Sequence, residues 1–181
     1  MAEFAAVEIP FVGTFTPHDC RGDGAARTTA RFVAAHGLRG FARDAGIGHV
    51  TASGFVVSPD RTMTLLMHHR KLDRWLQPGG HCDGNPDVRA VAAREVAEET
   101  GLTDIRLLSP RVFDIDVHSI PARGAEPEHL HYDIRFLFES DSALPVPGNG
   151  ESLALAWIGL TELERVTRAG SVLVVRNLAG W

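Results

Sequence analysis

Apolar and polar residues alternate along two neighbouring stretches in the first half of the chain. These stretches are HVTASGFVVS at residues 49–58 and TMTLLMHH at residues 62–69, and Pro59-Asp60 stands between them. Alternation with a period of two is typical of a strand, and a short turn signal between two such runs indicates a hairpin. We therefore predict a β-hairpin over residues 49–69.

The segment HLHYDIRFLFE, residues 129–139, carries the clearest strand pattern in the chain. Its even-numbered positions are apolar, and most of its odd-numbered positions are polar. Such alternation predicts a strand with one face in the core and a polar face that could line a cleft. The segments IRLLSPRVFDIDVHSIP, before it, and LALAWI, after it, are also expected to form strands.

Two helices are predicted in this part of the chain. The first covers residues 86–100, because Asn85 can cap it, Pro86 fits its first position and Gly101 can end it. The second begins at about Thr161, which forms a capping-box pattern with Glu164.

The N-terminal residues differ in composition from those that follow them. Residues 24–37, GAARTTARFVAAHG, are rich in alanine and end in glycine, which predicts a helix. We interpret residues 1–47 as a partly helical N-terminal extension that packs on a main domain of residues 48–181. The order of predicted elements, β-β-α-β-β-β-α, favours an α/β or α+β sandwich.

Composition narrows the class of protein. The chain has 181 residues, of which 44% are hydrophobic and 23% charged, and its formal net charge is −5. These proportions suit a globular domain with an extension, and the negative charge argues against nucleic acid as a partner. Cys20 and Cys82 fit neither a disulfide framework nor a metal-binding spacing. Because we find no signal-peptide pattern and no apolar run of membrane length, we expect a cytoplasmic protein with no membrane partner.

The helix predicted over residues 86–100 concentrates negative charge near its C-terminal end. Glu95, Glu98 and Glu99 stand at positions i, i+3 and i+4, so their carboxylates project from one face. A hard divalent cation such as Mg²⁺ or Mn²⁺ takes oxygen ligands and would neutralise this cluster. The alternative is an acidic face that is simply solvated. Gly79-Gly80, in the preceding loop, would let backbone approach a metal ion or a phosphate closely.

The stretch from Gly80 to Leu102 resembles the Nudix box. In that motif a glycine, then a glutamate, and then the run Arg-Glu-aliphatic-x-Glu-Glu-x-Gly-aliphatic follow at fixed spacing. Gly80 matches the first position, and residues 94–102, REVAEETGL, match the final run in order and spacing. The resemblance extends over roughly residues 48–165. One position departs from the motif, because Pro86 stands where the first glutamate is expected.

The resemblance implies both a fold and an activity. The fold would be an α/β/α sandwich with a mixed β-sheet, and the activity would be Mg²⁺- or Mn²⁺-dependent hydrolysis of a pyrophosphate bond in a nucleoside diphosphate derivative. Carried over by position, Glu95, Glu98 and Glu99 would be metal ligands or the general base, and the Gly80 carbonyl would be a further metal ligand. The family also includes dimers, so a homodimer is left open.

Two further site residues are inferred from the resemblance. Arg94 would normally pair with the motif glutamate that is replaced by Pro86, so Asp83 or Asp87 is expected to serve as its partner. Some family members use an additional acid from a loop before a tryptophan-containing strand, and Glu151 is the first candidate for it. Its rivals are the carboxylates Glu126, Glu128 and Asp133.

Basic side chains around the predicted strands are candidates for binding a substrate. His131 and Arg135 could contact phosphates or a base if the polar face of residues 129–139 lines a cleft, and Arg70, upstream, supplies further positive charge. The alternative is that these are polar residues with local partners. A zinc site made of histidines is less favoured, because no His or Cys spacing matches a structural zinc pattern.

The sequence therefore favours an enzyme and leaves other classes open. The leading hypothesis is a pyrophosphohydrolase acting on a small nucleotide derivative. The principal alternative is a Nudix-fold binding or regulatory module that does not cleave its ligand. An isomerase of isoprenoid diphosphates on the same fold is disfavoured, because we find no matching cysteine context.

Overall fold

The computed structural model describes residues 4–43, 46–70, 72–150, 152–178 and 180–181, and the chain forms two compact units. The first unit comprises Met1–Ala52, Gly80–Val91 and Arg111–Arg135. The second comprises Ser53–Gly79, Ala92–Pro110 and Phe136–Trp181. Several elements contribute residues to both units, among them β3 (Gly48–Val57), α2 (Val88–Thr100) and β9 (His129–Glu139).

Among the described residues, the main sheet has eight strands. Its order is β10-β4-β3-β9-β7, and β5, β6 and β8 pair with β4, β3 and β9 respectively. The strands not yet located are β4 (Met63–His69), β5 (Arg74–Leu76), β6 (Gly79–His81), β7 (Arg106–Leu107), β8 (Asp114–Ile120) and β10 (Ser152–Gly159). A multi-stranded sheet combined with helices confirms the predicted fold class. No helix in the described part of the chain is long and apolar enough to cross a membrane.

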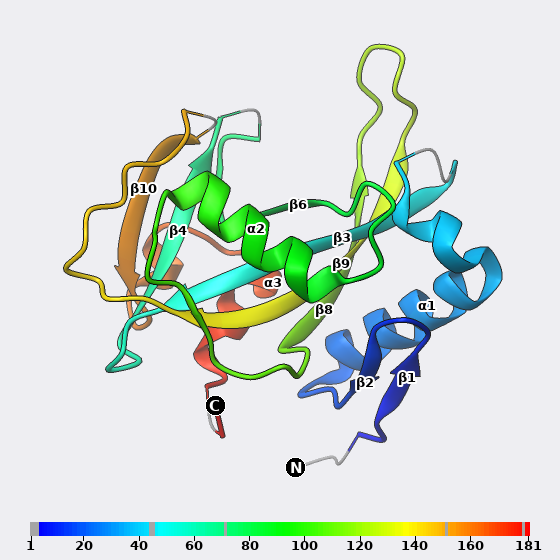
Figure 1. Cartoon of the computed structure of the whole chain (residues 1–181), viewed down its shortest axis with the longest axis horizontal. Helices are drawn as coiled ribbons and strands as arrows, with labels where there is room; N and C mark the ends of the chain where they lie inside the picture. Colours follow the sequence, from blue (N-terminus) through cyan, green and yellow to red (C-terminus); the bar gives the residue numbers. More distant parts are fainter. Residues whose placement is uncertain (1–3, 44–45, 71, 151, 179) are drawn as a thin grey trace. The chain divides into compact units, whose positions relative to one another are not determined.

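The first unit begins with a short hairpin and a long helix. The hairpin consists of β1 (Val7–Ile9) and β2 (Gly13–Phe15), and it lies beside helix α1 (Cys20–His36), as Figure 1 shows. The helix starts before residue 24, where it was predicted to start, because the Asp19 carboxylate caps it by accepting the backbone N–H of Gly22 at 2.7 Å. A 3₁₀ turn, η1 (Gly37–Phe41), follows. The expected N-terminal helix is therefore confirmed.

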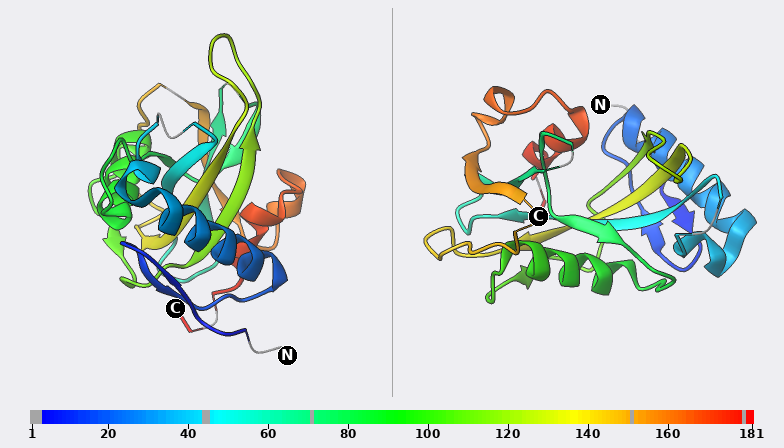
Figure 2. Two further views of the ribbon diagram at one scale, coloured as in Figure 1. Left: turned by 90° about the vertical axis from the view of Figure 1, so that its right-hand side faces the viewer. Right: turned by 90° about the horizontal axis from the view of Figure 1, so that it is seen from above.

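Helix α1 packs along strand β8 within the first unit (Figure 2). Its Phe32 ring stacks on Tyr132 of β9 with ring centroids 4.0 Å apart. Near the start of the helix, the Arg21 guanidinium donates to the Ile115 carbonyl oxygen at 3.1 Å and to the Asp116 carboxylate at 3.0 Å. Apolar burial and charged hydrogen bonds thus both hold helix α1 against β8 and β9 within this unit.

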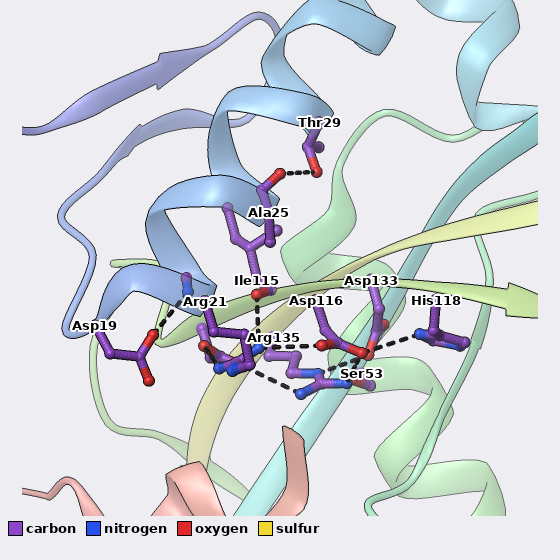
Figure 3. Close-up of polar contacts among 12 residues, drawn as sticks. Asp19, Arg21, Ala25, Thr29, Ser53, Ile115, Asp116, His118, Asp133 and Arg135 are labelled. Atoms are coloured by element: carbon purple, nitrogen blue, oxygen red, sulfur yellow. Dashed lines mark hydrogen bonds and ion pairs between the residues drawn. The ribbon is translucent and has the colours of Figure 1, made fainter. Parts of the chain in front are cut away.

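The polar face of β9 is buried, contrary to the expectation that it lines a cleft. Arg135 is 2% exposed, and its guanidinium donates to Asp133, Asp114 and Asp116 at 2.8, 3.0 and 3.2 Å (Figure 3). Thr51 also donates its hydroxyl hydrogen to Asp133 at 3.1 Å. Asp133 and Arg135 are therefore satisfied inside the protein rather than by a ligand.

Burial and neighbouring opposite charges together set the pKa values of the ionisable groups in this network. Burial raises the pKa of Asp114, even though Arg135 and Arg21 act to lower it. The pKa of Asp116 falls to about 2, because the hydrogen bond with His118 and the charges of both arginines outweigh its burial. Three carboxylates also raise the pKa of Arg135 despite its burial. All of these charges depend on one another, so removing one should leave the others uncompensated.

In the second unit, β4 lies between two antiparallel partners. Leu65 is paired with Val56 of β3 and with Trp157 of β10. The first pairing confirms the predicted hairpin, and both strands are largely buried. In β3 a side chain at Gly54 would clash, because an added Cβ would lie 2.5 Å from the Phe138 ring and 2.7 Å from the Val96 side chain. Gly54 thus allows helix α2, which carries Val96, to approach the strand closely.

The continuous helix predicted from Thr161 is absent from the described residues, and three short helical segments replace it. These are η2 (Leu163–Arg165), α3 (Gly170–Leu173) and η3 (Val174–Arg176). The Arg165 N–H bonds to the Glu162 carbonyl, three residues back, so the segment forms a 3₁₀ turn in place of an α-helix. The capping-box pattern was therefore misleading, and buried Leu163 anchors the turn instead.

Replacing Arg135 with methionine should destabilise the protein strongly. The substitution keeps an apolar stem of similar length but leaves Asp114, Asp116 and Asp133 facing one another without their central cation. We expect a loss of about 3–5 kcal/mol in the free energy of unfolding, measured by urea denaturation at pH 7.

The matched control is Arg27→Met, which removes a guanidinium from an exposed pair with Asp23 on α1. It should leave the unfolding midpoint almost unchanged. Equal midpoints for the two variants would contradict a structural role for the Arg135 network.

Candidate active site

Helix α2 holds the acidic residues, and its first turn differs from the prediction. The helix starts at Val88, and the Asp87 carboxylate accepts the backbone N–H of Ala90 at 3.1 Å. Asn85 instead accepts the N–H of Asp87 at 3.0 Å, one step before the helix. Asp87 is thus the N-cap, which corrects the assignment of that role to Asn85 and of the first helical position to Pro86.

The end of α2 agrees with the prediction. Gly101 has φ +71°, and its N–H bonds to the Ala97 carbonyl at 2.9 Å. An added Cβ at Gly101 would lie 2.5 Å from Cγ of Pro147, so glycine is required for both conformation and space. This tight closure fixes the last turn of the helix, which carries Glu98 and Glu99.

Arg94 lies among the carboxylates of its own helix. It contacts Glu95 at 2.8 Å and Glu98 at 2.9 Å. Burial acts to lower the pKa of Arg94, but these two carboxylates raise it overall. The expected partners are engaged elsewhere, since Asp83 pairs with Arg43 at 2.6 Å and Asp87 caps the helix. Glu95 and Glu98 therefore take the place that Asp83 or Asp87 was predicted to fill.

The three glutamates sit in different environments despite sharing one helix. Glu99 is 7% exposed and accepts the backbone N–H of Gly79 at 2.8 Å. The Glu95 side chain is 14% exposed, whereas that of Glu98 is 56% exposed. The segment thus presents one fixed carboxylate, one partly covered carboxylate and one that reaches solvent.

Three other predicted site residues, Gly80, Arg70 and Glu151, lie outside this helix. Gly80 lies in β6, next to the Gly79 that contacts Glu99. Arg70 donates to the carbonyl oxygens of Gly150 at 3.2 Å and Ser152 at 3.4 Å. Glu151, the candidate additional acid, lies outside the described residues.

Arg135 and His131, both predicted to bind substrate, lie in the first unit. Because the Arg135 guanidinium is buried among three carboxylates, we assign it a structural role in place of a phosphate contact. The His131 ring lies 4.7 Å from that of His49 and 5.2 Å from that of His129, centroid to centroid. His131 thus belongs to a cluster of imidazoles.

Burial lowers the pKa of two histidines in this cluster. Burial, reinforced by neighbouring imidazoles, lowers the pKa of His49 to about 4 and that of His131 to about 2. Both rings are therefore neutral near pH 7. His49 was not predicted as a site residue, because it stands in the same alternating pattern as the polar residues Thr51 and Ser53.

Comparison with known proteins assigns the chain to a family. The model of the NUDIX domain matches residues 48–176, and the chain therefore belongs to the Nudix family. The RNA pyrophosphohydrolase of Caulobacter vibrioides is 36% identical over 73 residues, which cover 39% of this chain and 42% of that protein. The matched region is thus less than half of the relative.

Solved structures of low sequence identity share the fold. A C. elegans Ap4A hydrolase has a TM-score of 0.58 and 18% identity, covering 73% of this chain and 98% of its own. The E. coli dihydroneopterin triphosphate pyrophosphohydrolase also has a TM-score of 0.58, with 16% identity and coverage of 71% and 93%. The expected Nudix resemblance is thus confirmed at the level of family and fold.

Replacing Asp87 with alanine should destabilise the protein by about 1 kcal/mol, because the Ala90 N–H would lose its capping acceptor. The change is measured as the shift in free energy of unfolding in urea. Asn85→Ala serves as the control and should have a smaller effect. The reverse order would restore Asn85 as the cap and would contradict a helix start at Val88.

Proposed function

We propose that this protein is a divalent-cation-dependent hydrolase that cleaves a pyrophosphate bond in a nucleoside diphosphate derivative. The observation that carries the proposal is the arrangement on α2, where Arg94 joins Glu95 to Glu98 and the Gly79 N–H fixes Glu99. Family membership supports the same reaction class.

The donor set fits a hard cation. Glu95, Glu98 and Glu99 offer only oxygen atoms, and carboxylate oxygens are the ligands that Mg²⁺ and Mn²⁺ prefer. Three carboxylates stand against one guanidinium in this segment, so it carries net negative charge. We propose these glutamates, with the carbonyl of Gly80, as the residues that hold the cation. When bound, such a cation neutralises phosphate oxygens and lowers the pKa of a water molecule.

The chain's own residues supply orientation and proton transfer. The Gly79 N–H holds one oxygen of Glu99, which sets the direction of that carboxylate. Arg94 restrains Glu95 and Glu98 in the same way. One of the three carboxylates accepts a proton from the attacking water as its oxygen bonds to phosphorus and the bridging oxygen leaves. Arg70 remains a candidate for contact with substrate, and Glu151 remains the candidate for the additional acid.

The named relatives support hydrolysis of phosphoanhydrides without defining one substrate. One is named an RNA pyrophosphohydrolase, another an Ap4A hydrolase and a third a dihydroneopterin triphosphate pyrophosphohydrolase. We therefore propose a substrate with a nucleotide-like group attached to a diphosphate or longer chain. The alternative is a module that binds such a ligand without cleaving it.

Glu98→Gln and Glu99→Gln should each lower turnover by about 10²- to 10⁴-fold. Each substitution removes one charged oxygen donor and changes side-chain volume little. Purified protein with Mg²⁺ or Mn²⁺ is incubated with nucleoside triphosphates, dinucleoside polyphosphates, nucleotide sugars, ADP-ribose, NADH and 5′-triphosphorylated RNA. Products are separated by chromatography, and the substrate that is cleaved fastest is used for the variants.

Glu162→Gln is the matched control, because Glu162 is also an exposed glutamate paired with an arginine in the same unit. It should retain wild-type turnover. Equal turnover in all three variants would remove Glu98 and Glu99 from the site. Absence of turnover in the wild type, with binding still visible by thermal shift, would establish the binding module instead.

Pro86→Glu restores the glutamate that the family motif places at this position, and it should change turnover less than about threefold. Arg94 already has Glu95 and Glu98 as partners, so an added carboxylate has no unpaired guanidinium to complete. Steady-state rates on the preferred substrate test this expectation. A gain of tenfold or more would show that the pairing of Arg94 is incomplete.

A further inference from the structure

Three histidines that are far apart in the sequence meet inside the first unit. His49 lies near the start of β3, and His129 and His131 lie on β9, two residues apart and therefore on one face of that strand. Gly48 allows β3 and β9 to approach closely here, because a Cβ added at Gly48 would lie 2.4 Å from the Leu130 carbonyl oxygen. The Leu130 N–H also bonds to the Ile47 carbonyl at 3.0 Å.

The three imidazoles each have a buried nitrogen that lacks a hydrogen-bond partner. The Nε2 atoms of His49, His129 and His131 are all in this state. His49 is 3% exposed and His129 is 6% exposed. Buried polar atoms are almost always paired, so three orphaned nitrogens in one cluster indicate a missing ligand.

The spacing of the rings fits coordination of one ion. Candidate ligand atoms of the three residues all lie within 4.8 Å of one another. The ring centroids are 5.0 Å apart for His49 and His129, 4.7 Å for His49 and His131, and 5.2 Å for His129 and His131. For zinc–nitrogen bonds of about 2.0–2.1 Å and tetrahedral angles, imidazole centroids lie about 5 Å apart. Modest rotation of the rings would therefore bring three nitrogens to one centre.

Hydrogen bonding prepares His129 as a ligand. Its Nδ1 lies 2.9 Å from the Pro127 carbonyl oxygen, which can only accept a hydrogen bond. Nδ1 therefore carries the hydrogen, and Nε2 carries a lone pair. This is the arrangement by which a backbone carbonyl orients a metal-bound histidine. The nearest carboxylate to His129 Nε2, from Glu126, is 3.8 Å away and too far for a hydrogen bond.

We propose that His49, His129 and His131 bind a divalent transition-metal ion of the zinc type. Imidazole nitrogen suits such ions, whereas Mg²⁺ prefers oxygen, so this donor set differs chemically from the glutamates of α2. Three protein ligands leave a fourth position. The His81 ring also lies near the cluster, 5.0 Å from His49 and 5.2 Å from His131 between ring centroids. The site does not depend on the hydrolase proposal.

Metal binding tests the proposal directly. Full-length protein is stripped with a chelator, mixed with Zn²⁺ in the presence of excess Mg²⁺, desalted, and analysed for metal by mass spectrometry. We expect about one zinc ion per chain to survive desalting. Co²⁺ in the same protein should give the visible absorption of a four-coordinate nitrogen site, which carboxylate ligation does not produce.

His129→Gln should weaken Zn²⁺ binding by about 10²-fold or more, because one of three nitrogen ligands is lost. His49→Gln should do the same, and circular dichroism checks that each variant is folded. If His49→Gln does not fold, His129→Gln and the wild-type Co²⁺ spectrum decide the question. The matched control is His18→Gln, which changes an exposed histidine of the same unit.

Glu98→Gln separates this site from the glutamates of α2 and should retain zinc. The proposal is overturned if wild-type protein loses its zinc on desalting or if His129→Gln binds zinc as tightly as wild type. Loss of zinc from Glu98→Gln would also overturn it, because the ion would then belong to the carboxylates.

Discussion

Strand β9 is buried along most of its length, so its polar side chains must find partners inside the protein. At its centre, Arg135 meets this constraint with three aspartates, and Asp114 and Asp116 in turn bind Arg21 of helix α1. The same network therefore satisfies a central strand and anchors the N-terminal helix. Towards the start of β9, the constraint is not met in the same way, since the Nε2 atoms of His129 and His131 have no partner.

The contrast between the centre and the start of β9 is chemical. A guanidinium carries several donors in a rigid fork and can neutralise several carboxylates at once. In the histidine cluster, by contrast, the Nε2 atoms of His49, His129 and His131 find no partner among the surrounding protein groups. The central network is thus complete with protein groups alone, whereas the histidine cluster is complete only when something external shares its lone pairs.

Patterns in the sequence predicted the strands and the acidic helix but not the neighbours of their polar residues. Alternation identified β9, yet both its faces are buried, because the partners of Arg135 come from β8 and from the same strand. The capping signal at Asn85 was wrong because Asp87 caps the helix instead. The capping-box signal at Thr161 was wrong because a 3₁₀ turn forms around buried Leu163. His49 could not be joined to His129 from spacing, since only pairing of distant strands brings them together.

The acidic helix shows how a departure from the family motif can be accommodated. Without a glutamate at position 86, Arg94 turns to Glu95 and Glu98 of its own helix, which offsets the repulsion between like charges at i,i+3. A cation that binds these carboxylates would compete with Arg94 for the same oxygens. Glu99 is fixed independently by the Gly79 N–H, so at least one of the proposed ligands would keep its direction while the others exchange partners. Arg94 thus offsets part of the negative charge of the helix, and in the proposed cation site the Gly79–Glu99 hydrogen bond would hold Glu99 in place if a cation displaced Arg94.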